Sequence, residues 1–212
     1  MSKRFKIIKD YYEEGLNLYN KTYATFNPGL TVVIGCNGSG KTTLLKQIKF
    51  QLEKEDAALY SFDNYRDGGY AARNNACFFG DMDFLIAGVT SSEGENIRLN
   101  IGNVAKECGR LHKEYPDAKE HWILLDGIDS GFSIDNIIEV KEFFYDLINK
   151  YNKDIDTYII ATANEFELAN NENCFDIHNF KYCKMRNYEE YKQYILNSKA
   201  IKEKREVWFD KI

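Results

Sequence analysis

A glycine-rich stretch near the start of the chain carries residue types that bind polyphosphates. It follows the pattern of a glycine, four free positions and then Gly-Lys-Ser/Thr. Glycines let the backbone approach phosphate oxygens and turn successive N–H groups toward them. The Lys41 ammonium would neutralise the β- and γ-phosphates, and the Thr42 hydroxyl would bind Mg²⁺. The predicted nucleotide-binding residues of this stretch are Gly35, Cys36, Asn37, Gly38, Ser39, Gly40, Lys41, Thr42 and Thr43.

The flanking residues place this stretch between a strand and a helix. Residues 30–34 are β-branched and apolar, which predicts a buried strand. Residues 41–53 carry apolar side chains at helical spacing. A helix that begins at Lys41 would add the positive end of its dipole to the phosphate site. This context favours nucleotide binding over an ordinary glycine-rich turn.

A carboxylate follows a second apolar run, residues 121–126, which predicts a buried strand that ends at Asp126. In open α/β sheets, ligands bind at the carboxyl edge of the strands, where the glycine-rich stretch would also lie. We therefore expect Asp126 to hold Mg²⁺ opposite Thr42, directly or through water. The alternative is an aspartate that only caps the end of a strand.

The remaining pattern alternates strands with helices and predicts an α/β P-loop NTPase fold, with a mixed, mostly parallel sheet flanked by helices. Strands over 5–9 and 16–26 would add a small antiparallel layer at the N-terminus. A polar loop is expected over 63–69. We expect residues 1–212 to form one domain, with a C-terminal helix over about 187–212 packed on it. Further strands are expected over 57–62, 157–162 and 174–185, and helices over 74–86, 95–111, 134–148 and 166–169.

Composition favours a cytoplasmic protein. The chain has 212 residues and a net charge of -5, which does not call for nucleic acid or a membrane surface as partner. Its 5 cysteines are scattered without metal-ligand spacing, as expected for reduced thiols. The N-terminal residues lack the apolar core of a signal peptide, and no apolar run is long enough to span a bilayer.

The order of these motifs resembles that of ABC-type ATPase heads related to chromosome-maintenance and repair proteins, and of small ATPases of bacteria and their phages. The likeness rests on the glycine-rich stretch, on a serine-glycine segment ahead of a helix, and on the strand that ends at Asp126 with the loop 129–133 after it. The serine-glycine segment consists of Ser92, Glu93, Gly94 and Glu95.

This resemblance implies ATP and Mg²⁺ as cofactors and a head-to-tail homodimer that closes around ATP. Ser92 and Gly94 would bind the γ-phosphate of ATP held by the second subunit, and the loop 130–133 would cross the dimer interface. Too few residues separate Thr42 from Ser92 in the sequence for a long coiled-coil arm to be inserted between them. We therefore expect the head to act alone or on a separately encoded effector protein.

Three positions depart from the family pattern. Gly127 stands where the family has a glutamate that acts as general base, and Ala163 and Asn164 stand where it has a histidine. No glutamine occurs between Gln51 and Gln193, where the family has one after a core strand. General-base catalysis typically contributes about 10²–10⁴-fold, so we expect ATP binding with slow hydrolysis. The candidates for these missing roles are Asp63, Asn64, Asp67 and Asp129.

Two other functions remain open from the sequence. A P-loop kinase for a small molecule would need an arginine-bearing lid, for which Arg66, Arg73 and Arg98 are available. A DNA-associated module would use the basic residues of the tail, although interleaved glutamates favour a solvated helix face. The basic residues are Lys192, Lys199, Lys202, Lys204 and Arg205.

An aromatic side chain could complete the nucleotide site. Tyr11 or Tyr12 could stack on an adenine ring, and we take Tyr12 as the candidate. A tyrosine half-buried at the edge of a sheet is an equal alternative.

Overall fold

A six-stranded sheet forms the centre of the molecule, with strand order β4-β5-β6-β3-β7-β8. The computed structural model describes residues 1–12, 17–67, 93–151 and 155–209. Strands β4, β5, β6, β3 and β7 are parallel, and only β8 is antiparallel to its neighbour. The strands are β3 (Gly29–Ile34), β4 (Ala58–Asp63), β5 (Glu120–Asp126), β6 (Asp156–Thr162), β7 (Cys174–Asp176) and β8 (Lys181–Cys183).

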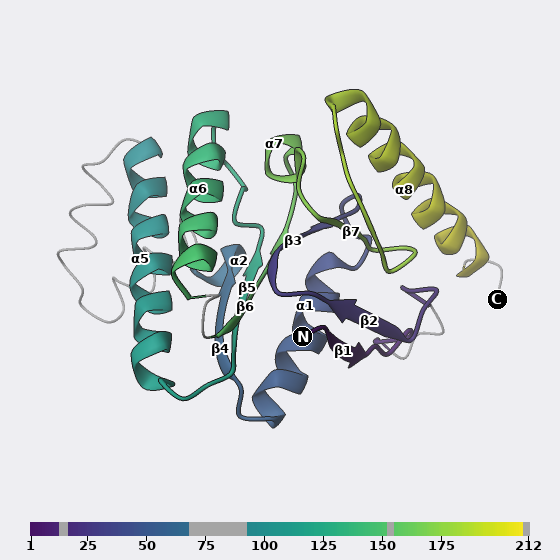
Figure 1. Cartoon of the computed structure of the whole chain (residues 1–212). Coiled ribbons are helices and arrows are strands. Elements are labelled where there is room, and N and C mark those ends of the chain that lie inside the picture. Colours follow the sequence, from purple (N-terminus) through teal and green to yellow (C-terminus); the bar gives the residue numbers. More distant parts are fainter. Residues whose placement is uncertain (13–16, 68–92, 152–154, 210–212) are drawn as a thin grey trace.

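Helices cover both faces of this sheet (Figure 1). Helices α5 and α6 lie side by side on one face, and α1 lies on the other face together with a two-stranded antiparallel layer of β1 and β2. Helix α8 lies near β7, next to the small helix α7. The bounds are β1 (Lys3–Lys6), β2 (Tyr23–Phe26), α1 (Lys41–Lys54), α2 (Asn64–Asp67), α5 (Glu93–Glu114), α6 (Ile134–Tyr151), α7 (Phe166–Ala169) and α8 (Tyr188–Phe209).

Alternate residues of the central strands face two separate hydrophobic cores, as expected for a sheet covered on both sides. On β5, Ile123 and Leu125 join the core under α5 and α6, whereas Trp122 and Leu124 join the core under α1. Because both faces are buried, these strands are continuous apolar runs, and this is why they could be predicted from the sequence. The predicted fold class is confirmed.

The N-terminal strands are shorter than predicted. Residues 16–26 were expected to form one strand, but β2 contains only Tyr23–Phe26, and the expected strand over 5–9 is replaced by β1 (Lys3–Lys6). Residues 17–22 leave the β ladder and turn toward the glycine-rich stretch, where the Tyr19 hydroxyl donates a hydrogen bond to the Gly40 carbonyl. A tertiary contact therefore overrides the local strand pattern.

The predicted loop over 63–69 is also partly wrong, because it begins with one helical turn, α2. The Asp67 carboxylate accepts a hydrogen bond from the Asp63 backbone N–H at 2.8 Å, which stabilises this turn. The helix expected over 74–86, and Arg73, Cys77 and Ser92, lie outside the described residues. Within the described part of the chain, no helix is long and apolar enough to cross a membrane.

Candidate functional site

The glycine-rich stretch forms the connection between β3 and α1, and we call residues 35–42 the phosphate loop. Lys41 and Thr42 are the first two residues of α1. Gly38 and Gly40 have φ angles of 75° and 99°, in the region that favours glycine. A Cβ atom on Gly35 would lie 2.4 Å from Ser39 Oγ, so only glycine fits where the loop begins. As predicted, the glycine-rich stretch lies between a strand that ends at Ile34 and a helix that begins at Lys41.

Lys41 is held inside this loop. Its Nζ donates to the Gly35 carbonyl at 2.7 Å, and the residue is only 8% exposed. Burial lowers the pKa of Lys41, and the nearby Cys36, Asp129 and Asp126 oppose this shift. An anion beside the ammonium would favour its charged form in the same way. The loop thus holds one buried ammonium group against the carbonyls of Gly35 and Cys36.

Two carboxylates end neighbouring strands beside this cation. Asp63 of β4 and Asp126 of β5 are register partners at the carboxyl edge of the sheet. The Thr162 hydroxyl, at the end of β6, donates to Asp126 Oδ1 at 2.8 Å and accepts from the Gly127 N–H at 2.8 Å. Thr162 therefore orients Asp126. The sequence indicated only a buried strand at this position and did not identify this contact.

A cavity of about 380 Å³ joins the phosphate loop to these carboxylates. Its wall includes Lys41, Thr42, Asp63, Asp126 and Asn164. Hydroxyl and carboxylate oxygens are the ligands that Mg²⁺ prefers, and Mg²⁺ is usually bound by one or two carboxylates together with substrate phosphates. The donor set of Thr42 and Asp126 fits this ion, and Asp63 offers a further carboxylate on the same wall.

Asp129 has a different role from Asp126. It is 1% exposed, and its two carboxylate oxygens accept hydrogen bonds from the backbone N–H groups of Asn164 (2.7 Å) and Glu165 (2.8 Å) and from the Asn164 amide (3.2 Å). Burial raises the pKa of Asp129, and the bonds from these N–H groups oppose this. Asp129 therefore positions the turn after β6 and has no exposed surface for a water molecule.

The backbone at Gly127 has a left-handed conformation that residues with a side chain rarely adopt. Its φ angle is 65°, and an added Cβ would lie 3.3 Å from Ser130 Oγ and 3.4 Å from Asn64 Cβ. A residue with a side chain would be strained in this left-handed conformation. The backbone at position 127 therefore favours glycine over a residue with a side chain.

Two tyrosines approach the phosphate loop from the N-terminal segment. The Tyr12 hydroxyl lies 3.2 Å from Thr43 Oγ1, and Tyr12 lines the cavity with 58% of its surface exposed. Tyr19 is buried, and its hydroxyl donates to the Gly40 carbonyl at 2.8 Å. The sequence analysis named Tyr12 as a candidate but not Tyr19. Tyr19 lies within the strand predicted over residues 16–26, so the turn that brings it to the phosphate loop was not predicted.

The residues of the serine-glycine segment are placed only in part. Glu93, Gly94 and Glu95 form the first turn of α5, so this helix begins two residues before its predicted start at Glu95. Arg66, a candidate for a kinase lid, forms an ion pair with Asp63 at 3.3 Å. This pairing directs Arg66 to the carboxylates at the edge of the sheet.

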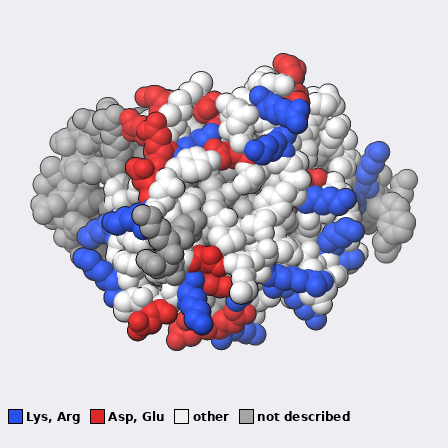
Figure 2. Space-filling view, viewed as in Figure 1, with Lys and Arg blue, Asp and Glu red and all other residues white. Residues whose placement is uncertain are grey.

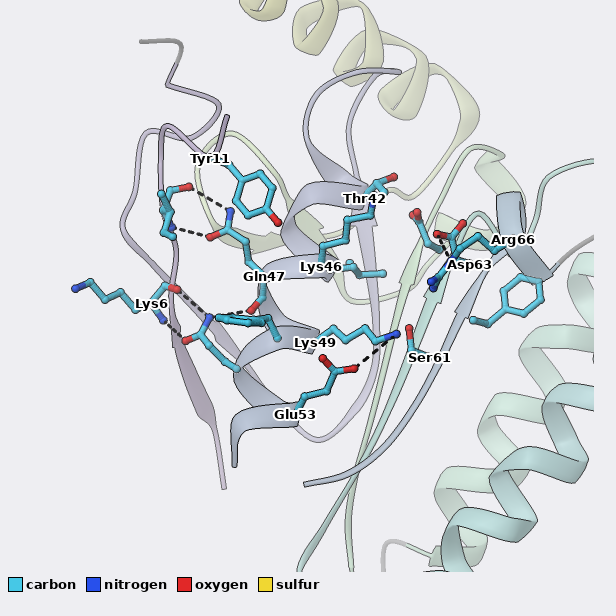
Figure 3. A pocket seen from close by; sticks show the side chains of 16 residues that line it. Lys6, Tyr11, Thr42, Lys46, Gln47, Lys49, Glu53, Ser61, Asp63 and Arg66 are labelled. Atoms are coloured by element: carbon cyan, nitrogen blue, oxygen red, sulfur yellow. Dashed lines mark hydrogen bonds and ion pairs between the residues drawn. The ribbon is translucent and has the colours of Figure 1, made fainter. Parts of the chain in front are cut away.

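A larger cavity of about 1010 Å³ shares Thr42, Asp63 and Asp126 with the first and extends along α1 (Figure 3). Lys49 extends from α1 toward β4, whereas Gln47 points to the N-terminal layer. Tyr11 lies in this cavity and not in the one that contains the phosphate loop. Tyr11 is therefore less well placed than Tyr12 to contact a ligand of that loop.

The basic residues of the tail do not form one uninterrupted surface. Lys192 pairs with Glu189 at 3.6 Å, and Lys199 pairs with Glu203 at 3.8 Å. Arg205 points back to the protein, where it donates to the Leu18 carbonyl. On the face shown in Figure 2, blue side chains are separated by uncharged ones. These observations do not favour a nucleic-acid surface on α8.

Comparisons with known proteins identify a family for this chain. A family model described as AAA domain matches residues 14–209. Among solved structures, the ADP conformation of MJ1267, an ATP-binding cassette of an ABC transporter, is similar with a TM-score of 0.49 and 15% identity over 95% of this chain and 97% of that chain. A comparison with curated proteins found no match. The family match includes the phosphate loop and Asp126, and the chain therefore belongs to the AAA domain family of P-loop ATPases.

Proposed function

We propose that this chain binds ATP-Mg²⁺ in the cavity above the phosphate loop and closes a head-to-tail homodimer around the nucleotide. The observation that carries the proposal is the convergence of Lys41, Thr42 and Asp126 on one cavity wall. Lys41 and the loop N–H groups would bind the β- and γ-phosphates, while Thr42 and Asp126 would hold Mg²⁺. Bound Mg²⁺ would neutralise phosphate charge. Tyr12 is the candidate for contact with the adenine ring.

Hydrolysis would be slow in the isolated protein. Gly127 has no side chain to activate water, and Ala163 and Asn164 stand where the family has a histidine. The loss of a general base costs about 10²–10⁴-fold in rate, or roughly 3–5 kcal/mol of barrier. Asp129 is too buried to act as the substitute base. Asp63, which lines the cavity beside Asp126, is the better candidate for that role.

In the proposed dimer, each ATP would contact the phosphate loop of one subunit and the first turn of α5 of the other. The first turn of α5 contains Glu93, Gly94 and Glu95, and the N-terminus of a helix favours anions. In the proposed arrangement this turn faces the γ-phosphate held by the partner subunit. Closed symmetric assemblies with reciprocal contacts are usual for homodimers. A separately encoded effector protein would respond to the closed state.

Sedimentation with and without ATP-Mg²⁺, run together with a phosphate-release assay, tests this proposal. We expect ATP-dependent dimers and slow release of phosphate without any acceptor. Turnover in the range of tens per second without a partner would contradict the proposed slow hydrolysis. Transfer of phosphate to a small molecule, without dimers, would instead support a kinase.

Replacing Lys41 tests the site itself. Lys41→Ala should abolish ATP binding in a calorimetric titration, because it removes the only side-chain cation that lines the cavity of the phosphate loop among the described residues. Lys54→Ala, at the end of the same helix, is the matched control and should leave ATP affinity unchanged. An unchanged ATP affinity in Lys41→Ala would refute the assignment of the site.

A further inference from the structure

One peptide group of the phosphate loop is held from two sides. Its carbonyl, from Gly35, accepts a hydrogen bond from Lys41 Nζ at 2.7 Å. Its N–H, from Cys36, donates to the Ser198 hydroxyl at 2.9 Å. Ser198 lies on α8 and is separated from Cys36 by 162 positions in the chain. The C-terminal helix therefore contacts the same peptide unit that holds the candidate phosphate-binding lysine.

Ser198 belongs to a row of side chains, one helical turn apart, that faces the loop from outside. One turn earlier, the Tyr194 hydroxyl lies 3.1 Å from the Ile34 carbonyl oxygen. One turn later, Lys202 Nζ lies 2.8 Å from the position that a Cβ on Gly38 would occupy. Residues four apart share one face of a helix. Helix α8 thus follows the loop from the end of β3 to Gly38.

The Ser198 hydroxyl is fixed by its surroundings. Ser198 is 1% exposed, and its Oγ lies 2.6 Å from His178 Nε2. His178 is itself buried, and its backbone N–H donates to Asp176 Oδ1 at 2.9 Å. Asp176 Oδ1 also accepts from the Tyr194 hydroxyl at 2.8 Å. These contacts link β7, the turn after it and α8 into one support for the hydroxyl.

We propose that Ser198 is a positioning residue for the nucleotide site and that docking of α8 on the phosphate loop strengthens ATP binding. The inference rests on the proposed function. A buried N–H without a partner is costly, so removal of the hydroxyl would favour rotation of the Gly35–Cys36 peptide. That rotation would move the carbonyl that holds Lys41 and would disorder the loop N–H groups before phosphate binds. Preorganised groups bind more tightly because less ordering is needed on binding.

The first test measures ATP-Mg²⁺ affinity by calorimetry in the whole 212-residue chain. Ser198→Ala should weaken binding about tenfold, since loss of one buried hydrogen bond is worth roughly that factor in an equilibrium constant. Asn197→Ala changes the neighbouring exposed residue of the same helix, and its affinity should equal that of the wild type.

A matched pair separates the hydroxyl from packing at this tight position. Ser198→Thr and Ser198→Val add the same volume, but only threonine keeps a hydroxyl. We expect the threonine variant to bind ATP about tenfold more tightly than the valine variant. Equal affinities for this pair would overturn the role of the hydroxyl, even if both variants are less stable than the wild type.

The thiol of Cys36 reports on the loop directly. Iodoacetamide labelling, mapped by mass spectrometry, should modify Cys36 faster in Ser198→Ala than in the wild type, and ATP-Mg²⁺ should slow it. Cys174 is 0% exposed in the core and serves as the internal reference for general opening. Equal acceleration at Cys36 and Cys174 would indicate global destabilisation and would overturn the positioning role.

The outcomes distinguish this inference from the proposed function. A wild-type protein that binds no ATP would end the proposed function and the inference together. A wild-type protein that binds ATP, with a Ser198→Ala variant unchanged in affinity and in Cys36 labelling, would end only the inference. Weaker binding with selective labelling of Cys36 would support it.

Discussion

At the carboxyl edge of the sheet, one side chain orients Asp126, the candidate metal ligand. Asp126 comes from β5, but the hydroxyl that orients it comes from Thr162 of β6. The same hydroxyl accepts from the Gly127 N–H and so supports the left-handed turn that follows Asp126. One threonine therefore couples the Asp126 carboxylate to the left-handed backbone at Gly127.

Thr162→Val tests this coupling because valine keeps the shape and removes the hydroxyl. Asp126 would lose a donor and the Gly127 N–H would lose its acceptor, so we expect Mg²⁺-dependent ATP affinity to fall about tenfold. Affinity for ATP in the presence of a chelator should remain close to that of the wild type. Calorimetric titrations with and without Mg²⁺ measure both values. An equal loss in the two conditions would show that Thr162 does not act through Asp126.

At the scale of elements, two glutamines join α1 to the N-terminal layer. Gln47 accepts from the Ile8 N–H at 2.7 Å and donates to the Ile8 carbonyl at 3.2 Å. One turn later, Gln51 accepts from the Lys6 N–H at 3.1 Å and donates to the Lys6 carbonyl at 2.9 Å. Figure 3 shows the Gln47 side chain as it reaches from the helix to the backbone of the N-terminal residues. The glutamine amides thus take the place of a neighbouring strand.

We expect Gln47→Ala to lower the free energy of unfolding by about 1–3 kcal/mol, because it leaves two backbone groups of Ile8 without partners. Gln51→Ala should cost less, since its contacts to Lys6 are exposed to water whereas those of Gln47 are partly buried. Urea unfolding measures the change in free energy of unfolding for both glutamine variants, and Lys46→Ala, an exposed position of the same helix, is the control. A larger loss in Gln51→Ala than in Gln47→Ala would contradict this ranking.

At the scale of the whole molecule, buried histidines link stability to pH. Burial lowers the pKa of His178, with Arg205 acting in the same direction and Asp176 opposing it. Burial also lowers the pKa of His121. Below about pH 6.5, histidines of the unfolded chain take up protons, while these two resist protonation in the folded protein. The unfolded state then binds more protons, so the folded protein loses stability as pH falls.

His178→Gln should reduce this pH dependence. Glutamine does not titrate, and it retains a polar group that could contact Ser198. We expect a smaller difference in free energy of unfolding between pH 7.5 and pH 5.5 than in the wild type. Urea unfolding at the two pH values gives the comparison. An identical difference in both proteins would show that His178 is not the titrating group.

The sequence by itself determined the elements that local pattern can encode. The phosphate loop, the strand that ends at Asp126 and the alternation of strands with helices follow from residue type and spacing, because buried parallel strands are continuous apolar runs. The helix after Lys41 was predicted within one residue of its observed end at Lys54. These features depend on neighbours in the chain, so no three-dimensional information was needed to predict them.

Only the tertiary structure decided which distant side chains support the site. Ser198 contacts Cys36 across 162 positions, and Thr162 contacts Asp126 across 36. Tyr19 turns to Gly40 at the expense of a predicted strand. A hydrogen bond between remote residues leaves no periodic trace in the sequence, because its geometry exists only after the two hydrophobic cores have packed.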